Sequence, residues 1–246
     1  MSSVKAIFKK QIKDIYKNTS VLIQFIIYPV VAFAMTALVA RGDMVNTGES
    51  GMSENMFITM MASVFVGMGL IPFVANIVAE DKEKKSLRFL VMAGVKPYGY
   101  LLGIGGVVFF ASLFPALAFT IMGRFSGEEF WIFLAVLMSG VVASTILGLA
   151  IGIHAKNQQA ATGLAMPAAM VLGFGPIIAP FNAQVERIFS FFYTQQLNVV
   201  MDSFYSVTGH QSDTGLLLES FGIIGANIAV LIVLFVIAFA KKGLNG

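Results

Sequence analysis

The chain has 246 residues, of which 57% are hydrophobic and only 12% are charged, and its net charge is +3. An average soluble domain carries about 25% charged residues, so this composition excludes an ordinary soluble domain and indicates a protein that lies in lipid. Cysteine is absent, which excludes disulfides, thiolate metal sites and a cysteine nucleophile.

Six stretches are long and apolar enough to cross a bilayer, which takes roughly 20 residues. They contain no charged residue except Glu219, which lies near the start of the last one. We therefore predict an all-α integral membrane protein with six transmembrane helices in a single domain over residues 1–246. The expected spans cover residues 21–40, 56–79, 98–123, 130–153, 160–181 and 217–240.

Two segments outside the spans have amphipathic patterns. Within residues 1–18 one helical face is apolar, with Val4, Ile7, Phe8, Ile12 and Ile15, and another is basic, with Lys5, Lys9 and Lys13. This pattern is typical of a helix that lies in the membrane interface. Residues 183–205, between the fifth and sixth spans, alternate apolar and polar residues at helical spacing. We expect one or two short amphipathic helices there, at the outer rim.

The distribution of Lys and Arg predicts the orientation of the spans. Of the 16 Lys and Arg residues, all but Arg41, Arg124 and Arg187 fall in the N-terminus, the second loop, the fourth loop or the C-terminus. Lys and Arg concentrate in cytoplasmic loops, so we expect both termini in the cytoplasm. The same asymmetry accounts for the basic balance of the chain, so we expect membrane lipid and no nucleic acid as a partner.

No catalytic or metal-binding set is visible in the sequence. The two histidines, His154 and His210, are expected at opposite membrane faces and cannot share a metal. No G-x-x-x-x-G-K-[ST] motif is present, so no site for ATP phosphates is recognisable and we expect no cofactor on this chain. The spans also contain no buried chain of acidic, histidine or lysine residues, from which proton relays are built. Energy for uphill transport would then come from another polypeptide.

Several polar or helix-disturbing residues inside the spans are candidates for a substrate path or a hinge. They are Gln24, Tyr28, Pro29, Asn76, Pro167, Gly173 and Pro176. Gln24 and Asn76 either face a path or pack against a neighbouring helix. Proline removes a helical donor, so we expect a kink in the first span. In the fifth span, where Gly175 and Pro180 add to the crowding, we expect a broken or bent outer half.

Small residues recur every four positions in the fourth span, at Gly140, Ser144, Gly148 and Gly152. Such a stripe lets two helix backbones approach closely. It either packs against another helix of the same chain or forms a mobile or intersubunit contact.

The segment between the second and third spans, residues 80–97, is the most informative stretch. It starts with the densely charged run Glu80, Asp81, Lys82, Glu83, Lys84 and Lys85, followed by Ser86 and Leu87. It then becomes amphipathic and ends at Pro97. From charge alone, this loop could simply anchor two helices at the lipid surface.

The order of these features resembles the permease subunits of ABC-2 type ATP-binding-cassette transporters, especially small exporter permeases for peptides, bacteriocins or drugs. Those proteins have a cytoplasmic amphipathic helix and six spans. After the second span they carry a stretch reading roughly E-x-E-[KR]-x-x-[GS]-[TS]-L, followed by a proline. Residues 80–87 and Pro97 hold the corresponding places here, with Lys85, Ser86 and Leu87 where many members have Gly-Thr-Leu. The resemblance covers essentially the whole chain.

The resemblance implies a coupling helix that docks into a groove of a separate ATPase subunit. Its residues would be Glu80, Asp81, Glu83, Lys84, Lys85, Ser86 and Leu87. Residues 154–159 would form a second, smaller contact. The ATPase chain would bind ATP and Mg²⁺, and two ATPases would work with two copies of this or a related permease in a bacterial plasma membrane. The expected cargo is hydrophobic or amphipathic, for example a peptide toxin or an antimicrobial peptide.

Two other functions remain open from the sequence. One is a membrane immunity or sensor protein that binds a peptide and transports nothing, which the consistent absence of an ATPase partner would favour. The other is an ion-driven carrier, which the uncharged spans disfavour.

Overall fold

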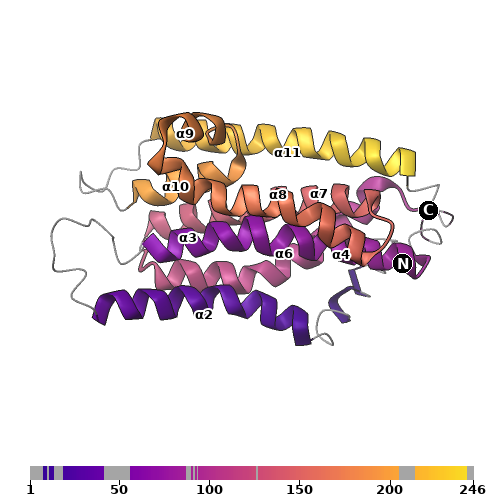
Figure 1. Ribbon diagram of the computed structural model, residues 1–246, viewed down its shortest axis with the longest axis horizontal. Coiled ribbons are helices and arrows are strands. Elements are labelled where there is room, and N and C mark those ends of the chain that lie inside the picture. The colour runs from indigo at the N-terminus through magenta and orange to yellow at the C-terminus, as the bar shows by residue number, and fades with distance from the viewer. Residues whose placement is uncertain are drawn as a thin grey trace.

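The computed structural model describes residues 8–9, 11–13, 19–41, 56–86, 90, 92, 94–125, 127–204 and 214–242. Within these residues the chain is helical apart from short turns, and the long helices run side by side as one bundle (Figure 1). The described N-terminal residues 8–9 and 11–13 (indigo) and the end of the C-terminal helix (yellow) lie at the same end of this bundle (Figure 1).

A long helix or an unbroken helical run covers each of the six expected ranges. The elements are α2 (Thr19–Arg41), α3 (Met56–Val64), a π-helical turn (Phe65–Gly69), α4 (Leu70–Glu83), α6 (Pro97–Met122), α7 (Glu128–His154), α8 (Gln158–Ile178) with a 3₁₀ turn (Ala179–Phe181), α9 (Ala183–Phe189), α10 (Tyr193–Ser203) and α11 (Thr214–Lys242). The second range is formed by α3, the π-helical turn and α4, which follow one another without a break.

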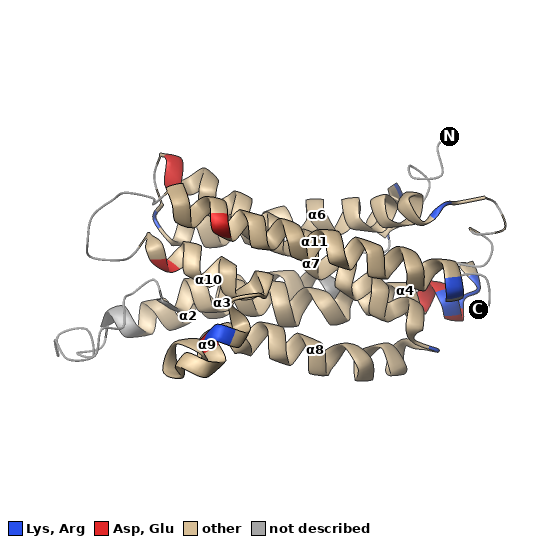
Figure 2. Cartoon of the chain, turned by 90° about the horizontal axis from the view of Figure 1, so that it is seen from above, with Lys and Arg blue, Asp and Glu red and all other residues tan. Residues whose placement is uncertain are grey.

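Five helical runs are long and apolar enough to cross a membrane: Phe57–Glu83, Pro97–Met122, Glu128–His154, Gln158–Phe181 and Thr214–Lys241. In the described part of α2, the apolar stretch Leu22–Leu38 is shorter than these five runs. The structure therefore supports an all-α membrane protein with five candidate spans, and the sixth span stays a prediction. Charged residues of the described part gather toward the two ends of the bundle (Figure 2).

The helices α4 and α7 form the centre of the bundle, and the glycine stripe of α7 lies between them. A Cβ atom added to Gly152 would lie 2.6 Å from the carbonyl oxygen of Ala75, and one added to Gly148 would lie 2.8 Å from that of Ile71. Only glycine permits this approach of two backbones. The stripe is thus a packing surface within the chain, which is the first of its two alternatives.

The fifth expected span does not break. The chain stays α-helical through Pro167 and Pro176 and tightens to a 3₁₀ turn only at Ala179–Phe181. Proline is tolerated inside membrane helices because neighbouring groups satisfy the freed carbonyls. The prediction of a broken outer half is therefore wrong, while a bend or a hinge there stays a prediction.

Two short helices follow α8, and they differ in burial. Helix α9 has no buried residue, and Asn182 caps its start by accepting from the N–H of Gln184 at 2.9 Å. Helix α10 is buried together with its polar side chains, which include Thr194, Gln195, Gln196 and Asn198. The expectation of a helix at the rim therefore describes α9, whereas α10 is buried, and among its polar residues Gln196 and Asn198 find partners inside the bundle.

Three side-chain hydrogen bonds hold α10 in the bundle, and one of them runs from the Ser220 hydroxyl of α11 to Gln196 Oε1 at 2.9 Å. The Ser63 hydroxyl donates to the Asn198 side chain, and the Ser144 and Tyr193 hydroxyls lie 2.7 Å apart. Burial raises the pKa of the Tyr193 hydroxyl above its usual value, so this group remains protonated and able to donate.

Of the expected interfacial helix over residues 1–18, the structure describes residues 8–9 and 11–13, which are helical. Phe8 packs edge-on against Phe110 of α6, with ring centroids 6.0 Å apart, whereas Lys9 and Lys13 are exposed. These positions show the expected division into apolar and basic faces. The other members of the pattern, Val4, Lys5, Ile7 and Ile15, lie outside the described residues.

Candidate functional site

The charged run after the second span begins inside a helix. Residues 80–83 form the last turn of α4, and the chain leaves the helix at Lys84 and Lys85. Lys85 has a φ of 58°, a left-handed conformation that ends the helix with a sharp turn. The prediction that this run starts a loop is therefore wrong for residues 80–83. The helix continues because their side chains find partners on neighbouring elements.

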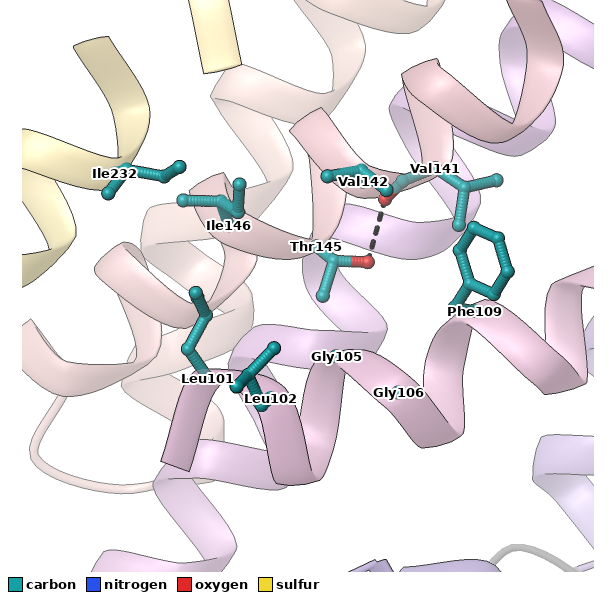
Figure 3. A pocket seen from close by; sticks show the side chains of 10 residues that line it. All are labelled: Leu101, Leu102, Gly105, Gly106, Phe109, Val141, Val142, Thr145, Ile146 and Ile232. Carbon is teal, nitrogen blue, oxygen red and sulfur yellow. Dashed lines mark hydrogen bonds between the residues drawn. The ribbon is translucent and has the colours of Figure 1, made fainter. Parts of the chain in front are cut away.

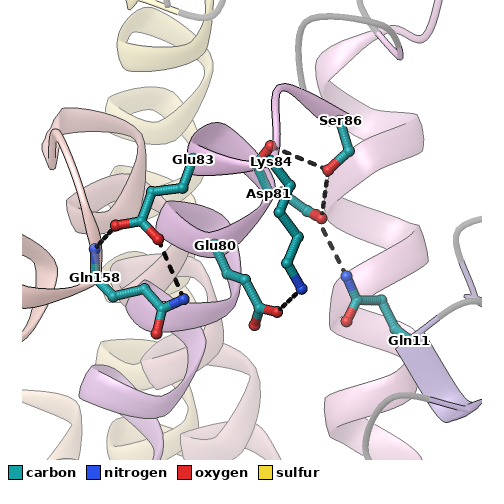
Figure 4. Close-up of polar contacts among 7 residues, drawn as sticks. All are labelled: Gln11, Glu80, Asp81, Glu83, Lys84, Ser86 and Gln158. Carbon is teal, nitrogen blue, oxygen red and sulfur yellow. Dashed lines mark hydrogen bonds and ion pairs between the residues drawn. The ribbon is translucent and has the colours of Figure 1, made fainter.

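Asp81 is buried at 3% exposure and accepts hydrogen bonds from three directions. The Ser86 hydroxyl lies 2.9 Å from Oδ1, the Tyr100 hydroxyl donates to Oδ2 at 3.1 Å, and Gln11 Nε2 donates to Oδ2 at 3.3 Å. Figure 4 shows Gln11 and Ser86 converging on this carboxylate. Asp81 thus connects the end of α4 to α6 and to the N-terminal segment.

Lys82 reaches the end of α7. Its ammonium group donates to the carbonyl oxygen of Ile153 at 2.8 Å and to that of Ala155 at 2.6 Å. The last carbonyls of a helix have no partner within the helix, and a cation there also suits the helix dipole. Lys82 therefore fixes the end of α7 to the end of α4.

Glu83 reaches the start of α8. Its Oε1 accepts from the backbone N–H of Gln158 at 2.9 Å, and its Oε2 lies 3.4 Å from Gln158 Nε2 (Figure 4). Asn157 adds a helix cap by accepting from the N–H of Ala160 at 2.8 Å. A carboxylate at a helix N-terminus satisfies free N–H groups and complements the dipole. The second and fourth loops are therefore joined into one unit.

The remaining residues of the run face outward. Glu80 and Lys84 form an ion pair one helical turn apart, with 44% and 65% of their side chains exposed, and Lys85 is also exposed. Leu87 lies outside the described residues. The predicted coupling residues thus divide into Asp81 and Ser86, which bond to each other, Glu83, which caps α8, and an outward group of Glu80, Lys84 and Lys85.

The π-helical turn brings three of the candidate path or hinge residues together. Gln24 Nε2 donates to the carbonyl oxygen of Gly69 at 2.9 Å, and the Tyr28 ring packs against the same glycine. On the other side of the turn, a Cβ atom added to Gly67 would lie 2.6 Å from the backbone nitrogen of Gly173. The Gln24 amide is therefore engaged in helix packing. Turns of this kind are frequent at functional sites.

The other candidates are spread over the bundle. Asn76 accepts from the Thr162 hydroxyl at 3.1 Å, which links α4 to α8. Pro29 and Pro176 are buried, whereas Pro167 is exposed on α8. The structure does not bring these four residues together with the residues on the two sides of the π-helical turn in a single site.

Sequence reasoning missed several residues that complete the site. Gln11, Tyr100 and Gln158 are partners of the charged run, and Lys82 was not counted among the coupling residues. These contacts join residues far apart in the chain, and no local pattern marks them. Only the helix start at Asn157 carries a local signal, because Asn is a preferred N-cap.

Comparison with known proteins adds one finding. A family model described as ABC-2 family transporter protein matches residues 3–240. The comparison with curated proteins finds no match. Since the family match extends over nearly the whole chain and the structure is a bundle of apolar helices, the chain belongs to the ABC-2 transporter family of membrane proteins.

Proposed function

We propose that this chain is the permease subunit of an ABC-2 exporter and that a separate subunit binds ATP and Mg²⁺ and hydrolyses the nucleotide. Family membership supports the transport role. The lack of a recognisable motif for ATP phosphates in the sequence supports a separate motor. The distribution of Lys and Arg supports a cytoplasmic position for both termini and for the last turn of α4.

In this proposal α2 is the first of six spans and adds to the five candidates of the structure. Its 23 residues form one helix, and at about 1.5 Å per residue such a helix is long enough for a hydrocarbon core of about 30 Å.

The main structural support for the proposal is the position of the last turn of α4. Its outward group, Glu80, Lys84 and Lys85, is accessible to another protein. The side chains of the same turn contact α6 through Asp81, α7 through Lys82 and α8 through Glu83. Displacement of this turn by an ATPase would therefore act on three long helices at once, which is what coupling requires.

The cargo in this proposal is hydrophobic or amphipathic, for which a peptide toxin or an antimicrobial peptide is an example. Large apolar side chains are exposed along α2 and α8, among them Phe33, Leu38, Val171 and Ile178. Contiguous apolar surface of this kind is covered by lipid, by a partner or by a substrate. A second copy of this or a related permease would cover part of it.

The test is co-purification of the chain with the products of its neighbouring genes, among which we expect an ATPase. In the double variant Glu80→Lys with Lys84→Glu, the ion pair is kept but the outward charges are exchanged. We expect about tenfold less ATPase to co-purify, because like charges across an interface cost several kcal/mol. The control is Glu128→Lys, which changes an exposed acid at the opposite end and should leave the complex intact.

Two outcomes would contradict the proposal. One is a charge-exchanged variant that retains the ATPase and transports normally, which would show that Glu80 and Lys84 are not part of the docking site. The other is a wild-type chain that never associates with an ATPase, which would remove the permease function itself.

A further inference from the structure

A groove of about 500 Å³ lies between α7, α8 and α11 at the end of the bundle that carries the last turn of α4. Its walls include the apolar residues Ile151, Leu164, Leu234 and Ile237. Two other lining residues, His154 and Lys241, belong to the last turns of α7 and α11 and lie at the end of the groove.

The groove exists because α8 and α11 are separated here. At the opposite end, α10 packs against α7, α8 and α11 and fills the space among them. Along their lengths, α8 packs mainly on α4, and α11 packs mainly on α7. No described helix takes the place of α10 at this end.

Charge distinguishes this groove from three others among the described residues. A cavity of about 280 Å³ between α6, α7 and α11 is lined by apolar residues and Thr145, whose hydroxyl donates to Val141 of its own helix (Figure 3). The grooves beside Phe110 and beside Phe174 are also lined without a charged residue. Of these four, only the groove at His154 and Lys241 combines apolar walls with a cationic side chain, that of Lys241.

The two polar residues stand where a lipid headgroup would lie. Lys241 is exposed at the end of its helix, and its long side chain can extend to the membrane surface. His154, whose Nδ1 lies 2.9 Å from the carbonyl oxygen of Ala150 in its own helix, also lines this end of the groove. Leu234 and Ile237 come one to two turns before Lys241 and therefore lie deeper toward the membrane centre.

We propose that this groove binds an anionic glycerophospholipid from the leaflet at this end of the bundle. The phosphate would lie against the Lys241 ammonium group, and an acyl chain would follow Leu164, Leu234 and Ile237. Basic pockets between membrane helices recognise anionic headgroups in this way. The proposal requires only that the chain lies in a bilayer, and it does not depend on an ATPase partner.

The chain permits a direct fluorescence test, because its single tryptophan, Trp131, is exposed at the opposite end of the bundle. The full chain with Trp131→Phe and Leu164→Trp would carry one reporter at an exposed wall of the groove. It would be reconstituted in phosphatidylcholine vesicles that contain either brominated phosphatidylglycerol or brominated phosphatidylcholine. Quenching of the reporter then measures which lipid occupies the groove.

We expect phosphatidylglycerol to be preferred over phosphatidylcholine by about fivefold, the ratio that one basic residue near a membrane surface gives. Lys241→Gln should abolish the preference. Lys96→Gln removes an exposed lysine that does not line the groove, and this control should retain the preference. Ile237→Trp provides a second reporter if the first variant does not reconstitute as a folded protein.

Several results would overturn the proposal. Equal quenching by the two lipids would exclude anionic recognition, and equal effects of Lys241→Gln and Lys96→Gln would reduce it to general surface charge. Absence of quenching by either lipid would mean that protein, such as a second copy of the chain, covers the groove. Loss of the preference on addition of soluble glycerol phosphate would assign the site to a free phosphate ester, whereas an unchanged ratio supports the lipid.

Discussion

The Glu83 carboxylate accepts a hydrogen bond from the backbone N–H of Gln158 at 2.9 Å, across a sequence separation of 75 residues. A side chain at the end of α4 therefore caps the start of α8. Together with Lys82 on the end of α7, this contact makes the two short connections at this end of the bundle parts of one structure.

Replacement of Glu83 by Ala should destabilise the protein by about 0.5–2 kcal/mol, because the first N–H groups of α8 lose a charged acceptor. Thermal unfolding of the purified chain in detergent would measure the change. Gln159→Ala alters an exposed residue in the same turn of α8 and should leave the midpoint unchanged. Equal midpoints for the two variants would show that the contact contributes nothing to stability.

Replacement of Lys82 by Met keeps most of the side-chain length but removes the ammonium group from the carbonyls of Ile153 and Ala155. Acceptors left without a donor cost about 1–3 kcal/mol. The expected loss of stability can be followed by the denaturation midpoint. Lys85→Met, at an exposed position in the neighbouring turn, is the matched control. A larger effect at Lys85 than at Lys82 would contradict the assigned contact.

Asp81 and Tyr100 should show strong thermodynamic coupling, because the Tyr100 hydroxyl donates to a buried carboxylate at 3.1 Å. We expect Asp81→Asn and Tyr100→Phe each to destabilise the protein, with the Asp81 change larger, at about 1.5–3 kcal/mol. The double variant should lose less than the sum, because both single changes break the same bond. Strict additivity in the double-mutant cycle would rule out this bond.

Replacement of Gly67 by Ala should destabilise the bundle by about 1–3 kcal/mol, the usual cost of an added methyl group in a packed interior. The new Cβ atom would lie 2.6 Å from the backbone of Gly173, so α8 and the π-helical turn would have to separate. Gly163→Ala is the control, since its Cβ atom meets nothing within 4 Å. That change should stabilise α8 by about 0.5–1 kcal/mol. Equal effects on unfolding would disprove the close approach.

The positions of the long helices were predictable from sequence because the cost of burying charge in lipid leaves long uncharged stretches. Residues 98–123 were expected as a span, and α6 covers Pro97–Met122. The expected second span stopped at residue 79, one turn early, because charge ends an apolar stretch but does not end a helix. Whether the charged run begins a loop or continues α4 depends on partners that the local sequence does not reveal. Examples are Ile153, which accepts from Lys82, and Gln158, which donates to Glu83.

The burial of α10 was not predictable for a related reason. Helical periodicity separates apolar from polar residues and assumes that the polar ones face water. Asn198 and Gln196 instead accept hydrogen bonds from Ser63 and Ser220, so they can lie inside the bundle. The fifth span illustrates the same limit, because proline predicts a break only where no neighbouring helix supports the chain.

The end of α4 carries Glu80, Asp81 and Glu83 at the negative pole of the helix dipole, where carboxylates are disfavoured. Lys82 and the Glu80–Lys84 ion pair offset these carboxylates in part, and contacts with α6, α7 and α8 add to the stability of the turn. The outward surface at Glu80 and Lys84 is complete only after those helices have packed. An incompletely folded chain would lack this surface, so an ATPase that docks there, as proposed, would distinguish folded from incompletely folded chains.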